Sequence, residues 1–220
     1  MAEQSLTLNE LEEIGQKAIV FRRYVLRRAY GTYYAIWALA IFSYLLVPAV
    51  VYSSVGFFTW SSIAVAAADI AIGIAATIVT GKNFRKNART AALRRALNPT
   101  QGRRGYNFAV LWWAAFITVV ALSYLFSGFA AYFLLYGLLL LLDAFLYTWL
   151  RRNFPDRVPP EGVLAVVAFA AGAISSLSLS SAAGYSVFSA LPWSVVVAVW
   201  LFASIYAFKS APEELVELRY

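Results

Sequence analysis

Long apolar runs separated by short polar segments dominate this sequence of 220 residues. Each run is long enough to cross roughly 30 Å of hydrocarbon as a helix that rises about 1.5 Å per residue. Very short turns join the runs in pairs, which predicts three helical hairpins. The pattern therefore predicts an all-α, polytopic membrane protein with six transmembrane helices, at residues 29–51, 58–81, 106–127, 129–150, 162–182 and 191–208.

The first 28 residues carry a different pattern. Apolar residues recur there at steps of three or four, as in an amphipathic helix: Leu8, Leu11, Ile14, Ala18, Phe21 and Val25. We predict that this helix lies on the cytoplasmic interface or runs straight into the first span. A solvent-exposed extension of that span is the alternative. The chain is thus divided into an interfacial helix (1–28), a transmembrane domain (29–208) and a cytoplasmic tail (209–220).

Composition supports a membrane protein and excludes several kinds of chemistry. Hydrophobic residues make up 62% of the chain and charged residues 13%, whereas soluble domains carry about 25% charged residues. Such a chain has too little polar surface to coat a water-soluble particle. Cys and His are absent, which excludes disulfides, Cys/His metal sites, histidine bases and haem ligands. We expect no cofactor and no metal. The composition is also compatible with a thermophile, as it is with membrane proteins in general.

Positive charge gathers on one side of the predicted spans. The loop at residues 82–104 contains no acid and holds eight of the 18 Lys and Arg residues: Lys82, Arg85, Lys86, Arg89, Arg94, Arg95, Arg103 and Arg104. The turns within the three hairpins carry no charge. By the positive-inside rule, both termini of this cell-membrane protein are expected in the cytoplasm. Because the cations flank apolar spans, we expect them to contact anionic lipid headgroups or a protein partner, and not nucleic acid.

An acidic residue, Asp69, lies in the middle of the second predicted span, about 20 Å along a helix from Lys82. Gly73, Thr77 and Gly81 follow at steps of four, so this face is expected to meet protein or a wet crevice. No predicted span contains Lys, Arg or His, and burial without a cation favours the neutral carboxyl group. The functional interpretation is a proton or cation site. The alternative is a protonated Asp69 that forms a hydrogen bond between helices.

A second acid, Asp143, lies in the fourth predicted span, about 12 Å along the helix from Arg151. Tyr136 and Tyr147 are predicted to share its face, where their hydroxyl groups could donate hydrogen bonds. These residues are further candidates for a transport or proton site. The alternative for Asp143 is a structural ion pair with an Arg from a neighbouring helix end.

Small residues form a row at steps of four in the fifth predicted span: Ala168, Gly172, Ser176, Ser180 and Gly184. Such rows let helix backbones approach closely, and Ser can form hydrogen bonds across helices. Ala67, Ala71 and Ala75 form a second row in the second span. We interpret both rows as packing surfaces, and a hydroxyl-lined path for a polar substrate is the alternative for the Ser-rich row.

The sequence carries no recognisable catalytic motif. No His is present to partner a Ser, and neither Asp lies in a Gly-x-Gly-Asp pattern, so we expect no enzymatic activity. The amphipathic N-terminal helix, six spans, basic loop and Ser-rich region together resemble the layout of a small permease subunit of an ABC-type transporter. This resemblance implies a transport component that lacks its own ATPase and works with a separate cytoplasmic one. The alternative is a non-catalytic accessory or scaffolding subunit, assembled with other membrane subunits or with copies of itself.

Overall fold

The computed structural model describes residues 8–56, 59–89, 110–119, 129–155, 157–183 and 187–216, and these residues contain helices and no strand. The helices are α1 (Leu8–Val55), α2 (Thr59–Arg89), the short helix Val110–Val119, α5 (Phe129–Asn153), α6 (Pro160–Ala183) and α7 (Val187–Val216). Five of them are long and apolar enough to cross a membrane. The prediction of an all-helical, multi-pass membrane protein is therefore confirmed. The third predicted span is described only over the short helix.

The first helix, α1, is continuous over 48 residues. At about 1.5 Å per residue it is about 70 Å long, more than twice the thickness of the hydrocarbon core. It runs straight from the N-terminal segment into the first predicted span and passes Pro48 without ending. It ends at Val55, where Gly56 has a φ of 83° and donates its backbone N–H to the Tyr52 carbonyl at 3.0 Å. Gly adopts this left-handed conformation at little cost, which accounts for the turn.

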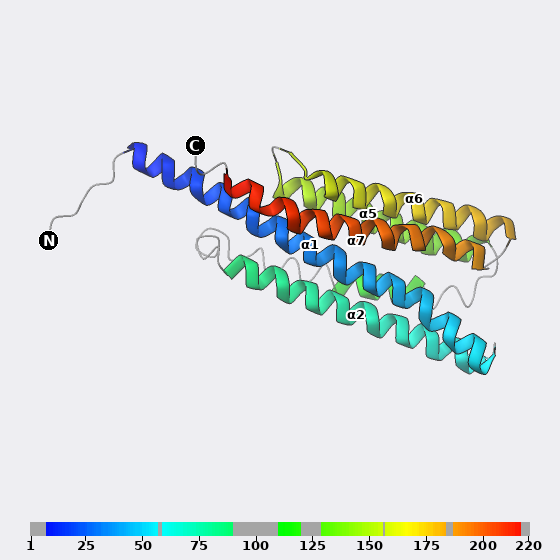
Figure 1. The fold of residues 1–220 in the computed structure, drawn as a ribbon. Coiled ribbons are helices and arrows are strands. Elements are labelled where there is room, and N and C mark those ends of the chain that lie inside the picture. The colour runs from blue at the N-terminus through cyan, green and yellow to red at the C-terminus, as the bar shows by residue number, and fades with distance from the viewer. Residues whose placement is uncertain are drawn as a thin grey trace.

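Helix α1 is the element that the other helices share. Figure 1 shows α5, α6 and α7 on one side of α1 and α2 on the other, and α1 packs against both α7 and α2. The start of α1 and of α6 lies at the same end of the bundle as the last turns of α2, α5 and α7 (Figure 1). We call this the basic end, because Arg27, Arg28, Lys82, Arg151 and Arg152 lie on the helix segments there.

Packing between the helices uses many small residues, and many large apolar side chains face outward. Ala38, Ala173 and Ala203 are completely buried, whereas Leu141 and Ile205 are 68% and 67% exposed. In a bilayer the lipid tails are as apolar as Leu, so little is gained by hiding large side chains, and small residues allow close backbone contact. The outer surface of the bundle is therefore suited to hydrocarbon.

The two predicted rows of small residues have different outcomes. On α6, Gly172, Ser176 and Ser180 are buried, and a Cβ atom on Gly172 would lie 2.5 Å from Val196 on α7. On α2, Ala67, Ala71 and Ala75 are all exposed, so this row does not pack against the described helices. Helix α2 instead turns a neighbouring face inward, and its buried residues are Ser61, Val65, Gly73, Ala76 and Thr80.

Aromatic side chains fill the interior near the basic end. The Tyr30 ring of α1 lies 5.2 Å from Phe84 of α2 and 5.3 Å from Trp149 of α5, measured between ring centroids. Asn153 donates a hydrogen bond to the Tyr30 hydroxyl at 2.9 Å, and Trp200 of α7 donates one to a backbone carbonyl of α6 at 2.8 Å. These contacts join five helices, and within the same cluster the buried Tyr34 hydroxyl has no hydrogen-bond partner among the described residues.

The closest contact between α1 and α7 gives a test of this packing. A Cβ atom on Gly31 would lie 3.2 Å from the Ala207 Cβ and 3.3 Å from the Ser204 carbonyl. We expect Gly31→Leu to lower the free energy of unfolding by about 1–3 kcal/mol, because the helices must move apart. Unfolding of the purified protein in detergent measures the change.

Gly137 on α5 is the matched control for this experiment. No atom of the described residues lies within 4 Å of a Cβ placed on Gly137, so Gly137→Leu should leave the free energy of unfolding nearly unchanged. Equal losses for the two variants would contradict the close contact between α1 and α7.

Candidate functional site

The predicted face around Asp69 meets two other helices at Gly73 and Thr77, whereas Gly81 at its end is exposed. Gly73 of α2 is buried, and a methyl group there would collide with the Tyr44 hydroxyl of α1 and the Trp113 ring of the short helix. Trp113 Nε1 donates to Thr77 Oγ1 at 3.1 Å, and Thr77 donates to the Gly73 carbonyl at 2.9 Å. Gly73 is thus a notch that admits two aromatic side chains one helical turn from Asp69.

Asp69 itself is only partly buried, but one of its oxygens is enclosed. Its Oδ1 atom has no hydrogen-bond partner within the described segments. The Tyr44 side chain is close enough to interact electrostatically with the carboxyl group. A buried oxygen without a partner is costly, and such oxygens in membrane proteins often bind protons or ions.

Asp143 on α5 repeats this arrangement nearer the basic end. The residue is 5% exposed, and its Oδ1 atom also has no hydrogen-bond partner among the residues that the structure describes. The Tyr33 side chain of α1 is close enough to interact electrostatically with it. A tyrosine of α1 is therefore within electrostatic range of each of the two acids.

These two tyrosines lie on one face of α1. At about 100° per residue, Tyr44 returns to within about 20° of Tyr33 and lies about 16 Å further along the axis. Trp37 lies between them, with its ring 6.3 Å from that of Tyr33. Trp37 Nε1 is buried and without a hydrogen-bond partner in the part of the chain that is described. We call Tyr33, Trp37 and Tyr44 the polar face of α1.

The other predicted site residues are distributed over the bundle. Tyr136 is 4% exposed, like Asp143, whereas Tyr147 is 40% exposed on the outer surface. Thr77 joins the Asp69 face as described above. Lys82, Arg85, Lys86 and Arg89 lie on the last turns of α2. The remaining predicted residues lie outside the described residues: Arg94, Arg95, Arg103, Arg104 and Gly184.

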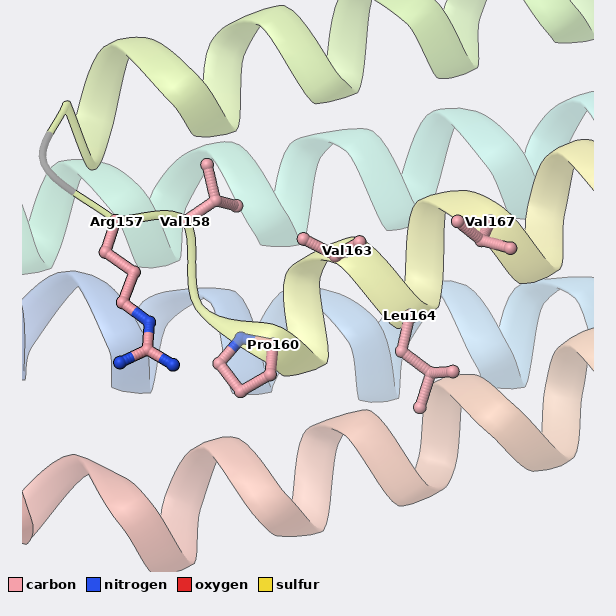
Figure 2. A pocket seen from close by; sticks show the side chains of 6 residues that line it. All are labelled: Arg157, Val158, Pro160, Val163, Leu164 and Val167. Carbon is pink, nitrogen blue, oxygen red and sulfur yellow. The ribbon is translucent and has the colours of Figure 1, made fainter.

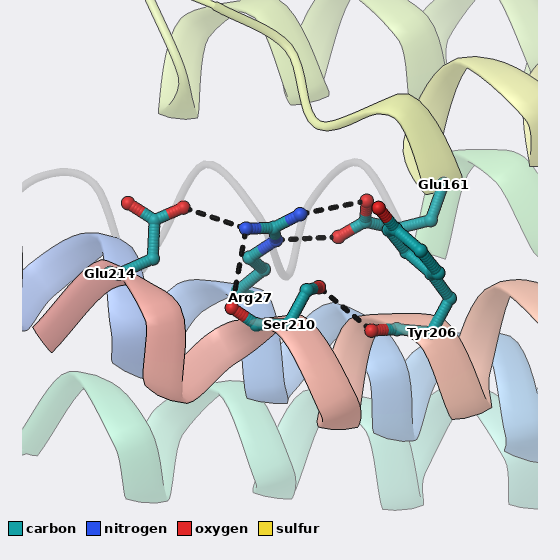
Figure 3. A network of polar contacts seen from close by, with 5 residues as sticks. All are labelled: Arg27, Glu161, Tyr206, Ser210 and Glu214. Atoms are coloured by element: carbon teal, nitrogen blue, oxygen red, sulfur yellow. Dashed lines mark hydrogen bonds and ion pairs between the residues drawn. The ribbon is translucent and has the colours of Figure 1, made fainter. Parts of the chain in front are cut away.

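A buried group of three charges at the basic end was not predicted from the sequence. Arg27 of α1 contacts Glu161 of α6 through two hydrogen bonds, Nε to Oε1 at 2.7 Å and Nη2 to Oε2 at 3.2 Å. Its Nη1 donates to Glu214 Oε1 of α7 at 2.8 Å (Figure 3). The Arg27 side chain is 11% exposed and that of Glu161 is 2% exposed. The charge triad therefore ties one helix to the ends of two others.

Local sequence explains how the triad is placed. Helix α6 begins at Pro160, and Glu161 lies in its first turn, where the helix dipole favours an acid. Glu214 lies in the last turns of α7. The sequence did contain a signal for this pairing. Acids are scarce beside the predicted spans, and Glu161 directly precedes one of them close to several cations, which makes it a candidate for an ion pair. The sequence does not show which of the neighbouring Arg residues it meets.

A shallow hollow on the outer surface of α6 is a poor candidate for a substrate site. It holds about 470 Å³ and is lined by Arg157, Val158, Pro160, Val163, Leu164 and Val167 (Figure 2). Val167 is 58% exposed, and Arg157 is the one charged residue in the lining. An apolar surface with a cation at the basic end is suited to lipid.

Comparison of the chain with models of known families, with curated proteins and with solved structures gave no match. The class that the fold defines is a multi-pass helical membrane protein. A more specific function has to be argued from the residues described above.

The charge triad predicts an order of stability among three variants. Arg27→Gln leaves two carboxylates without their cation, Glu161→Gln leaves Arg27 paired with Glu214, and Glu214→Gln leaves the bidentate pair intact. We expect losses in the free energy of unfolding in that order, the largest being about 3 kcal/mol. Chemical unfolding in detergent micelles at neutral pH measures them.

The neighbouring acid Glu213 provides the control, because it is exposed and on the same turn of α7. Glu213→Gln should change the unfolding free energy by no more than about 0.5 kcal/mol. If Glu214→Gln were as damaging as Arg27→Gln, the order argued from the geometry would be wrong.

Proposed function

We propose that this chain is a permease-like transport component of the membrane, without an ATPase of its own. The observation that carries the proposal is the pair of intramembrane acids, Asp69 and Asp143, each with an enclosed oxygen that lacks a described partner. Tyr33 and Tyr44 of the polar face of α1 are within electrostatic range of Asp143 and Asp69, respectively. A membrane protein has little reason to keep such groups in hydrocarbon unless they bind a proton or cation.

The positions of Asp69 and Asp143 along their helices support a path for a proton or cation along α1. Asp143 lies about 12 Å along α5 from Arg151, and Asp69 lies about 20 Å along α2 from Lys82. The polar face of α1 runs between the two levels, with Tyr33 near the first acid and Tyr44 near the second. Tyrosine hydroxyl groups can pass a proton, and the indole N–H of Trp37 can orient a water molecule by donating a hydrogen bond. Asp69, Thr77, Asp143 and Tyr136 are the residues we expect to form the transport path.

One observation favours a second function, that of an accessory or scaffolding subunit. Ala67, Ala71 and Ala75 form an exposed row of small residues on α2, and such rows are common where transmembrane helices meet. In this alternative the row would contact a neighbouring membrane subunit, and the two acids would be structural. The variants of Asp69 described below distinguish the two functions.

We also propose six spans, with both termini in the cytoplasm and anionic lipid at the basic end. The gathering of cationic helix segments at one end supports this orientation. A reporter that is active only in the cytoplasm should give a signal when fused after Tyr220. A reporter active only outside should give one when inserted at Gly56. Signals from the opposite pair of fusions would overturn the topology.

Two variants of Asp69 test the transport function. If the carboxyl group carries the proton or cation, Asp69→Asn should abolish transport while the protein stays folded, because Asn keeps the size and hydrogen bonding of Asp. Asp69→Leu should also abolish transport, because it removes the carboxyl group. Proton flux into proteoliposomes, complementation of a deletion strain and thermal unfolding are the measurements.

The accessory function predicts a different result for the same variants. A structural, protonated Asp69 can be replaced by Asn with little effect, whereas Leu would be damaging. A stable and fully active Asp69→Asn protein would therefore refute the transport role. Asp143→Asn is the companion variant, and loss of flux in both Asn variants would implicate the two acids together.

A further inference from the structure

A second hollow, at the basic end, differs from the apolar one on α6 in its chemistry. It holds about 290 Å³ and lies where α1, α2 and α7 meet. Tyr24, Arg28 and Thr32 of α1 and Asn83 of α2 supply its polar groups, and Phe21 and Phe208 supply apolar walls. Among the residues that the structure describes, no acid lines it. The cavity therefore combines a cation and neutral hydrogen-bonding groups with apolar surface.

The charge triad explains why this cavity is positive. Glu161 and Glu214 are both engaged by Arg27, the residue directly before Arg28. Within the described segments, Arg28 has no carboxylate partner. Its Nη1 donates to the Tyr24 hydroxyl at 2.8 Å, and its guanidinium lies 5.7 Å from the centre of the Tyr24 ring. The tyrosine thus orients the guanidinium without neutralising it.

The hydrogen bonding also leaves donors for a ligand. Because Tyr24 accepts from Arg28, its own O–H proton remains available for donation to an anion. Arg28 is exposed and has further N–H groups beyond the one that Tyr24 receives. A guanidinium beside a hydroxyl donor is an arrangement that binds phosphate oxygens well.

The position of the cavity identifies the source of the phosphate. Arg28 directly precedes the first predicted span, Asn83 closely follows the second, and Phe208 ends the sixth. The polar groups therefore lie at the level where three helices leave the hydrocarbon, which is the level of lipid headgroups. Phe21 and Phe208 are 46% and 40% exposed, so apolar surface borders the phosphate-binding groups. A free phosphate ion would make no use of that surface.

We propose that this cavity is a binding site for one anionic phospholipid, whose phosphate contacts Arg28 and Tyr24. The site is distinct from the proposed transport path and does not depend on it. A bound lipid here would bridge α1, α2 and α7 at the basic end.

Native mass spectrometry of the full-length protein tests the site. The protein is released from nanodiscs that contain equal amounts of phosphatidylglycerol and phosphatidylcholine with identical acyl chains. We expect one phosphatidylglycerol to be retained preferentially, and Arg28→Gln to lower its retention about fivefold, the effect of one basic residue at an anionic surface. Arg28→Lys keeps the charge and should retain more lipid than Arg28→Gln.

Arg152→Gln is the matched control, because Arg152 is also exposed at the basic end but does not line the cavity. It should retain lipid like the unmodified protein. Equal retention by Arg28→Gln, or an equal loss in Arg152→Gln, would overturn the proposal.

Two further measurements complete the experiment. Excess inorganic phosphate should leave the bound phosphatidylglycerol in place, and displacement of the lipid by phosphate alone would show that the site serves a soluble anion. Asn83→Leu changes the opposite wall of the cavity and leaves every charge in place. It should also lower retention, and retention equal to that of the unmodified protein would count against the site even if Arg28→Gln failed to fold.

Discussion

One guanidinium group holds the basic end of the bundle together. Arg27 projects from α1 and contacts acids at the start of α6 and near the end of α7. A buried charge is tolerated only when it is paired and its hydrogen bonds are made, and here the pairing involves three helices at once. The aromatic cluster around Tyr30 and the Gly31–Ala207 contact begin within one turn of this group. Their positions therefore depend on the alignment that Arg27 imposes.

Away from this end, the structure relies on close approach of backbones. Ala38, Ala173 and Ala203 are completely buried, while many larger apolar side chains face outward. Such an interior gains its stability from van der Waals contact and a few hydrogen bonds, since hydrocarbon surrounds the bundle. Enclosed oxygens such as those of Asp69 and Asp143 stand out against that background. The proposed transport function rests on this contrast.

Helix positions could be predicted from the sequence because hydrocarbon thickness imposes a length on every span. The neighbours of each helix could not be predicted, because a four-residue spacing defines one face of a helix but does not show what that face contacts. The Gly172–Ser180 row of α6 turned inward, and the equally regular alanine row of α2 turned outward. Thr77 was predicted from its spacing with Asp69, but Tyr44 and Trp113 come from other helices. An aromatic hydroxyl as deep as Tyr44 was an available signal, because most tyrosines lie at the interface.

The continuity of α1 has a mechanical consequence. A helix that runs unbroken from Leu8 to Val55 is a stiff rod with one end held in the bundle and the other projecting beyond it. A protein or membrane surface that binds the projecting turns would tilt the whole of α1 about the point where Arg27 holds it to α6 and α7. Because Tyr33 and Tyr44 are both on α1, such a tilt would move them together relative to α5 and α2. Binding at the N-terminal turns of α1 would thereby change the positions of side chains in the middle of the membrane without any change in secondary structure.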